Sequence, residues 1–236
     1  MALVSATLAK MDAPEELLAW SAEFQSDLGA AWGRCPSPVW LFWLAGAAGT
    51  ALEKALAVVL TWSAEVATSV PEATELVLKT LETVEESARR GRGEACVAAA
   101  ERAESASRSA PASFRAKPPL GFEALTMAAA WAARAAEGLV ASRKRAEAVR
   151  MQRAQHVASL LGTGVDTTVE RETLMCLNTE SLPDSPVHAE LLYVVAALAQ
   201  SALYLVSTRE AQDPDRPRSS VEEDEAQVVR ALFKKL

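Results

Sequence analysis

The sequence contains little of the side-chain chemistry on which enzymes and metal sites depend. Its 236 residues include two histidines, His156 and His188, and three widely spaced cysteines, Cys35, Cys96 and Cys176. Such cysteines form neither a disulfide framework nor a Cys-x-x-Cys zinc knuckle, and they are typical of a reducing compartment. Neither histidine belongs to a His-Glu-x-x-His pattern. The sequence therefore predicts a cytoplasmic protein that is not an enzyme and has no metal or cofactor.

Targeting and membrane signals are also scarce. Residues 191–208 carry no charge and are bounded by Glu190 and Arg209, which reaches the lower length limit of a membrane-spanning helix. Polar Gln200, Ser201 and Ser207 dilute this stretch, so we predict a buried helix and no membrane association. The first ten residues place no basic side chain before their apolar stretch, so no secretory signal is expected.

Aromatic residues make up only 6% of the chain, yet five of the six tryptophans lie in the first 62 residues. Residues 39–44 are six consecutive bulky apolar side chains, which cannot all face one side of a helix and must be enclosed on most sides. Cys35 precedes this run near a helix start, where a thiolate would be favoured, but its proline and tryptophan neighbours favour a buried structural role. We predict a structural core that includes Trp32, Cys35, Pro36, Trp40, Trp43 and Trp62.

No stretch alternates with a period of two, so no strand is predicted. Apolar residues recur at helical spacing over about residues 14–32, 38–48, 52–68, 71–89, 94–108, 122–161, 168–178, 187–209 and 221–236. Capping-box patterns begin at Asp12, Thr50, Ser69, Thr167 and Ser220. The prediction is an all-α bundle of stacked helical hairpins over residues 1–162. A C-terminal helical module would cover residues 163–236, with proline-containing linkers at 109–120 and 212–220, the second of them mobile.

The net charge of −7 is unevenly distributed. Residues 1–90 carry 6 basic and 12 acidic side chains, residues 91–160 carry 11 and 6, and residues 161–236 carry 7 and 13. The acidic balance argues against nucleic-acid binding. The basic middle, with Arg134, Arg150, Arg153 and residues 143–145, is either a solvated face or a strip on which the acidic helices dock.

One acidic stripe is a candidate partner surface. Its glutamates recur at helical spacing within residues 71–89, so they share one face of the predicted helix. The alternative is that they are an ordinary solvated face. The candidate partner-binding residues are Glu72, Glu75, Glu82 and Glu86.

The tryptophan-rich segment resembles a motif of an alanine-rich, all-helical family of bacterial immunity proteins associated with polymorphic toxin systems. It reads Ala30-Ala31-Trp32-x-x-Cys35-Pro36-x-x-x-Trp40-Leu41-x-Trp43-Leu44-Ala45. As in the family, the motif is preceded by a Leu-Leu-Ala-Trp sequence at residues 17–20. A later helix that begins with proline ends at residues 88–91, and the family's closing helix resembles residues 150–161. The resemblance covers about residues 15–162. It departs from the family pattern at residues 37–39, where the family has polar or charged residues, and residues 163–236 have no counterpart.

The resemblance implies a protein that neutralises a cognate toxin by occlusion, with acidic faces meeting a basic toxin domain. The alternative is a helical scaffold or adaptor that self-associates or contacts a partner through its last apolar helices.

Overall fold

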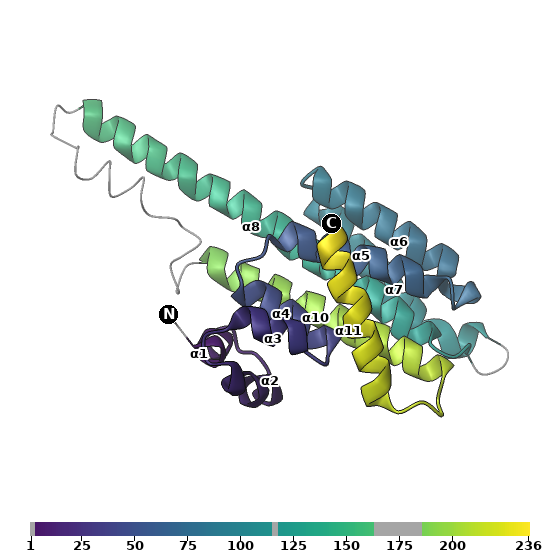
Figure 1. Ribbon diagram of the computed structural model, residues 1–236. Coiled ribbons are helices and arrows are strands. Elements are labelled where there is room, and N and C mark those ends of the chain that lie inside the picture. The colour runs from purple at the N-terminus through teal and green to yellow at the C-terminus, as the bar shows by residue number, and fades with distance from the viewer. Residues whose placement is uncertain (1–2, 115–117, 163–185) are drawn as a thin grey trace.

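The computed structural model describes residues 3–114, 118–162 and 186–236, and these residues form an all-α protein (Figure 1). The predicted fold class is confirmed, since the described residues contain ten α-helices, one short 3-10 helix and no strand. The elements are α1 (Val4–Ala9), α2 (Glu15–Ser21), η1 (Ala22–Phe24), α3 (Leu28–Arg34), α4 (Pro38–Ala47), α5 (Leu52–Ala67), α6 (Pro71–Arg89), α7 (Gly93–Ser113), α8 (Phe122–Gly162), α10 (Pro186–Gln212) and α11 (Arg218–Lys235).

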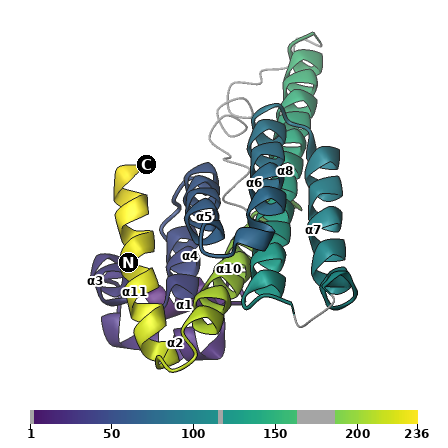
Figure 2. The ribbon, with the colours of Figure 1, turned by 90° about the vertical axis from the view of Figure 1, so that its right-hand side faces the viewer.

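Helix α8 is the centre of the bundle and contacts α5, α6, α7 and α10 (Figures 1 and 2). Small side chains permit this crowding, because helix axes approach closely where the facing residues are short. Gly138 marks one such approach, since a Cβ atom there would lie 2.9 Å from Cδ1 of Tyr193 on α10. The Ser201 hydroxyl of α10 also donates a 2.8 Å hydrogen bond to the Ala128 carbonyl of α8. Among the α8 residues whose side chains are described, the buried alanines are Ala128, Ala129, Ala130, Ala132, Ala133, Ala135, Ala136 and Ala146.

Helix α4 is enclosed on most sides, as its run of bulky apolar residues predicts. It begins at Pro38, which occupies the first helical position after Ser37, and none of its residues is exposed. Helices α1, α3, α5, α10 and α11 surround it. An amphipathic surface helix would leave one face in solvent, so α4 is a core helix.

The predicted helix over residues 14–32 is wrong, because the chain breaks it into α2, η1 and α3. Gln25 has a positive φ of 49°, a conformation that a continuous helix does not contain. Two residues later the Asp27 carboxylate accepts a 2.8 Å hydrogen bond from the Ala30 amide. Asp27 is therefore the N-cap of a new helix, α3.

The predicted capping boxes are also wrong where the structure describes them. Asp12 has a φ of 54° and lies before the N-cap of α2. The N-caps of α5 and α6 are Ala51 and Val70, each one residue after the predicted cap, Thr50 or Ser69. Neither N-cap makes a side-chain hydrogen bond to the helix. Ser220 lies inside α11, and the box at Thr167 and the helix at 168–178 lie outside the described residues. Backbone geometry therefore fixes these starts without the side-chain bond.

The predicted linkers are shorter than expected. Helix α7 continues through Pro111 to Ser113, so the helix predicted over 94–108 ends too early. Only residues 213–217 connect α10 to α11. The Gln212 side-chain amide donates to the Ser69 carbonyl at 2.9 Å, and the Arg216 guanidinium hydrogen-bonds to Ser220 and Asp224. These contacts fasten both ends of the connection predicted to be mobile.

Helices α10 and α11 share one hydrophobic core with the N-terminal helices. Apolar side chains of both helices belong to the same buried cluster as those of α4, α5 and α8. The boundary predicted at residue 162 therefore lies between two segments of one core. Residues 189–212 of α10 have the length and composition of a membrane-spanning helix, with a hydropathy of 1.7, and 56% of their most apolar window is buried in the bundle.

Candidate functional site

The acidic stripe predicted from the sequence forms a solvent-exposed face of α6. Glu72, Glu75, Glu82 and Glu86 are all exposed, and a rotation of about 100° per residue places them within one narrow sector of the helix. The buried residues of α6 are Ala73, Val77, Thr80, Leu81, Val84, Ser87 and Ala88, which pack toward the core. The α6 stripe, defined by these four glutamates, is therefore mounted on a rigid, well-packed helix.

The α6 stripe is not fully neutralised by its own neighbours. Arg90 pairs with Glu86 at 2.8 Å across one helical turn, and such exposed pairs contribute only a few tenths of a kcal/mol. Lys79 lies in the same sector of the helix but makes no ion pair among the described residues. Leu78 lies beside the stripe and is 41% exposed. The surface thus offers negative charge next to one exposed apolar side chain.

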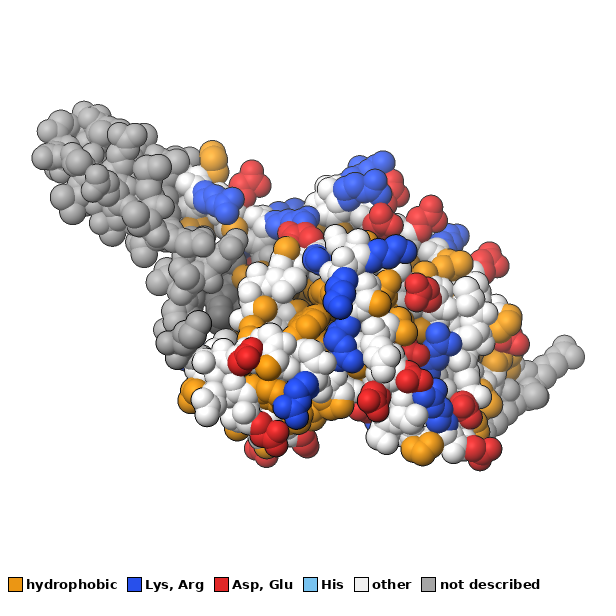
Figure 3. Space-filling view, in the orientation of Figure 1, with side chains coloured by type: hydrophobic (Ala, Val, Ile, Leu, Met, Phe, Trp, Pro, Cys, Tyr) orange, Lys and Arg blue, Asp and Glu red, His pale blue; other side chains and the backbone are white. Residues whose placement is uncertain are grey.

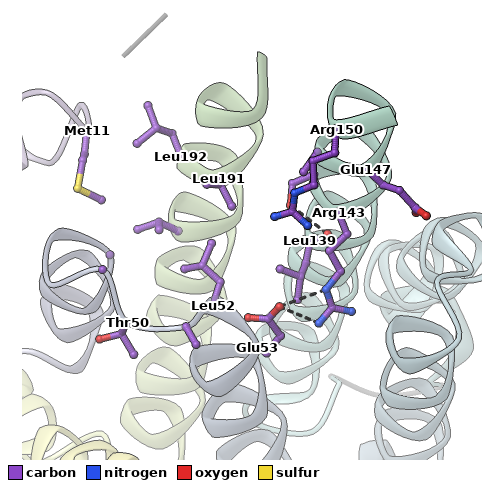
Figure 4. Close-up of a pocket in the computed structure, with 16 residues that line it drawn as sticks. Met11, Thr50, Leu52, Glu53, Leu139, Arg143, Glu147, Arg150, Leu191 and Leu192 are labelled. Carbon is purple, nitrogen blue, oxygen red and sulfur yellow. Dashed lines mark hydrogen bonds and ion pairs between the residues drawn. The ribbon is translucent and has the colours of Figure 1, made fainter. Parts of the chain in front are cut away.

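A second feature is a cavity of about 720 Å³ between α4, α5, α8 and α10 (Figure 4). Leu52, Leu139, Leu191, Leu192 and Val195 supply apolar walls. Thr50 and Ser142 supply hydroxyls, Glu53, Arg143, Glu147 and Arg150 supply charged groups, and the lining contains no imidazole or thiol. A cavity with mostly apolar walls accommodates an apolar group, and this lining holds no nucleophile–base pair.

An ion pair at the edge of this cavity joins three helices. Both Nε and Nη2 of Arg143 on α8 donate to Oε1 of Glu53 on α5, at 3.1 and 2.8 Å. Nη1 of the same guanidinium donates to the Ala88 carbonyl at the end of α6 at 3.2 Å. Partial burial alone would raise the pKa of the Glu53 carboxyl, but the Arg143 hydrogen bonds outweigh it and hold the pKa below its ordinary value. Glu53 therefore stays ionised and acts as a structural tie.

Three basic residues of α8 form ion pairs with neighbouring helices: besides Arg143, these are Arg134 and Arg145. The other basic side chains described on this helix, Lys144 and Arg150, are exposed. Arg134 Nε donates to Glu104 of α7 at 2.7 Å, and Arg145 Nε lies 2.7 Å from Oε1 of Glu190 on α10. Arg150 lies toward the cavity, whereas Glu147 points away from it (Figure 4). The side chain of Arg153 lies outside the described residues, as do those of His156, His188 and Cys176.

A buried polar contact fastens α11 to α5. The Trp62 indole N–H donates to Oε2 of Glu225 at 2.6 Å, and both residues are buried. Nε of Arg209 on α10 lies 3.2 Å from Oε1 of Glu225, which makes an ion pair although the N–H is not aligned for a hydrogen bond. A buried carboxylate is costly unless it is paired, so Trp62 and Arg209 together make Glu225 tolerable in the core.

The residues predicted to form the structural core do not all lie there. Cys35, Trp43 and Trp62 are buried, whereas Trp32 and Trp40 are half-buried and pack against the core. Pro36 is exposed, so its assignment to the core is wrong. It lies in the three-residue turn between α3 and α4, where a proline limits the chain's freedom without filling interior space.

Burial makes Cys35 an inert thiol. Desolvation by burial raises its pKa to about 12. The thiol donates a hydrogen bond to the Ser37 carbonyl at 3.2 Å. Burial likewise raises the pKa of Cys96 to about 11. Because the thiolate is the reactive species, neither group offers a nucleophile at neutral pH.

We therefore expect Cys35 and Cys96 to resist alkylation in the folded protein. In a Cys176→Ser variant at pH 8, iodoacetamide should modify these two cysteines at least about a hundredfold more slowly in buffer than in denaturant. Peptide mass spectrometry over a time course measures both rates. Equal rates in the two solvents would show that the thiols are accessible and ionised.

Reasoning from the sequence did not find the cavity or the Glu53–Arg143 tie. The residues that line the cavity come from four helices and from connecting loops. The two residues of the ion pair, 53 and 143, are 90 positions apart, so no local spacing links them. The only sign of the ion pair in the sequence was that residues 1–90 are net acidic and residues 91–160 net basic. This difference in charge does not identify which two residues pair. Comparisons of the chain with protein-family models, with curated proteins and with solved structures give no match.

Proposed function

We propose that this chain is a non-enzymatic binding protein of the immunity type, which neutralises a cognate toxin by covering a basic surface of it. The α6 stripe carries the proposal, because four carboxylates share one exposed face of a single helix. The resemblance of residues 15–162 to the immunity family supplies the kind of partner. On this proposal the protein works in the bacterial cytoplasm without a cofactor.

The packing of α6 supports binding by a preorganised surface. The buried residues opposite the stripe hold the helix in place, so binding orders little of the backbone and loses little entropy. Complementary charge mainly raises the association rate and excludes partners of the wrong sign. A stripe of fixed carboxylates on a chain of net charge −7 would therefore steer a basic toxin domain toward α6.

The alternative function, a scaffold that binds through its last apolar helices, has less support. Most apolar side chains of α11 face the core, including Val221, Val229, Leu232 and Phe233. Those of α10 contact α4, α5 and α8. Because most of these apolar side chains are already covered, the two helices lack a continuous apolar face for a partner, and only the edge of Phe233 beside the charged end of α11 lines an open groove.

Charge reversal on the stripe tests the proposed function. Glu82→Lys with Glu86→Lys should slow association with the toxin at low salt by about tenfold or more, because electrostatic steering is lost. The toxin candidate is the protein encoded by the neighbouring open reading frame, and biolayer interferometry at several salt concentrations measures the rate. Coexpression should show the matching loss of protection from growth arrest.

The matched control reverses two exposed glutamates of α7, Glu94→Lys and Glu101→Lys, which lie outside the stripe. This control changes the net charge equally, so it separates a local effect from a global one. The proposal fails if both double variants slow association alike. It also fails if neither does, or if the neighbouring protein does not bind.

A further inference from the structure

A shallow groove of about 380 Å³ lies between α3, the start of α5 and α11, on the face shown in Figure 3. Leu28, Trp32 and Phe233 form its apolar floor, and the edge of one ring meets the face of the other, with the centroids of Trp32 and Phe233 5.1 Å apart. Lysine and arginine side chains lie beside hydrophobic ones near the centre of this face (Figure 3). We call this feature the basic groove; its cations are Lys54, Arg230 and Lys234.

The positive charge of the basic groove is not neutralised by a carboxylate in its lining. Within the part of the chain that the structure describes, Lys54 and Lys234 form no ion pair. Arg230 donates from Nη1 to the Cys35 carbonyl at 2.6 Å, which fixes the side chain but leaves its charge. Three cations around an apolar floor favour a ligand that carries both carboxylates and an apolar side chain.

The same chain presents such a ligand on α6. Leu78 is 41% exposed, and Glu75 and Glu82 lie three residues before and four residues after it. Residues at these separations are neighbours on a helix surface. The α6 stripe with Leu78 thus combines an apolar side chain with flanking carboxylates, which matches the apolar floor and surrounding cations of the basic groove.

One copy of the chain cannot easily satisfy its own groove. Helix α5 lies between α11 and α6 (Figure 2), so the groove residues on α11 and the α6 stripe are separated by another helix. An interface between two different surfaces of identical chains is head-to-tail, and it extends into rings or open chains.

We propose that the basic groove binds the α6 stripe of a second copy, with Leu78 seated against Trp32 and Phe233. The carboxylates of Glu75 and Glu82 face Lys54, Arg230 and Lys234. Self-association then occupies the surface assigned above to the toxin, so a bound toxin and a second copy exclude each other. The groove and stripe carry this inference without the toxin assignment.

Two complementary double variants test the interface. A groove variant carries Lys54→Glu and Lys234→Glu, and a stripe variant carries Glu75→Lys and Glu82→Lys. Size-exclusion chromatography with light scattering measures mass against protein concentration at low salt and at about 0.5 M salt, where the screening length is only a few ångström. Circular dichroism confirms that each variant is helical.

The wild-type protein should rise in mean mass above the 25.1 kDa monomer as its concentration increases, and it should return to the monomer in high salt. Each double variant should stay monomeric. An equimolar mixture of the two should assemble again, because the intact stripe of the groove variant meets the intact groove of the stripe variant, and the reversed charges on the other two surfaces are also complementary.

Three results would overturn the proposal: a wild-type protein that is monomeric at every concentration, a double variant that still assembles, or a mixture that stays monomeric. A further arm titrates ATP and inorganic phosphate into the wild-type protein and follows tryptophan fluorescence. Saturable binding that the groove variant loses, in a protein that does not self-associate, would show that the groove takes a phosphate ligand instead. No toxin is present, so failure here is distinguishable from failure of the proposed function.

Discussion

Replacement of Trp62 by alanine should lower the free energy of unfolding by about 3–5 kcal/mol, the usual cost of emptying a large aromatic site in a core. Trp62 is fully buried, and its indole N–H satisfies one oxygen of Glu225. The substitution leaves a cavity and also deprives a buried carboxylate of a donor, which adds to the cost. Urea denaturation followed by circular dichroism measures the change.

Two milder variants divide the Trp62 effect into its parts. Trp62→Phe keeps most of the apolar volume but removes the N–H, so it should cost about 1–3 kcal/mol. Trp20→Ala is the matched control, because Trp20 is only half-buried and, within the described part of the chain, donates no hydrogen bond to a carboxylate. If Trp62→Ala cost no more than Trp20→Ala, the interior placement of the Trp62 ring would be wrong.

Enlarging an alanine at the centre of α8 should also destabilise the protein. Ala132 has no exposed surface, and α8 contacts four other helices. Ala132→Leu adds three carbon atoms to a close-packed site, and such overpacking typically costs about 1–3 kcal/mol. Thermal and urea denaturation should both show the loss, with a lower midpoint in each case.

The control for this prediction lies on the same helix. Ala148 is exposed, so Ala148→Leu changes the same side chain in solvent and should alter stability by no more than about 0.5 kcal/mol. Equal stability of the two leucine variants would mean that α8 does not pack closely against its neighbours. A loss confined to Ala132→Leu would locate the close packing where the structure has it.

The sequence predicted most helices well because the apolar spacing within each is local information. The start of α4 followed from Ser37 and Pro38, and the predicted range 71–89 coincides with α6. The break between α2 and α3 could not be predicted from periodicity, since Leu17, Phe24 and Leu28 keep helical spacing across it. Gln25 adopts a positive φ there, and only the Asp27 cap gives a local signal for a new start.

The same difference between local and tertiary information decides which surfaces could be predicted from the sequence. The α6 stripe was visible in the sequence because its members share one helix. The basic groove was not, since Trp32, Lys54 and Lys234 come from three helices that only tertiary packing brings together. Pro36 was wrongly assigned to the core for a related reason. Its sequence neighbours include tryptophans, but that does not determine whether a residue in the turn between α3 and α4 is buried.

The contact between Trp62 and Glu225 spans 163 residues, and this separation has a consequence during synthesis. A ribosome that adds about 5–20 residues per second needs roughly 8–30 seconds to pass from one residue to the other. Throughout that interval the helix that seals the indole edge of α5 has not been made. The nascent chain therefore leaves this edge of its core unsealed for many seconds, until α11 leaves the exit tunnel.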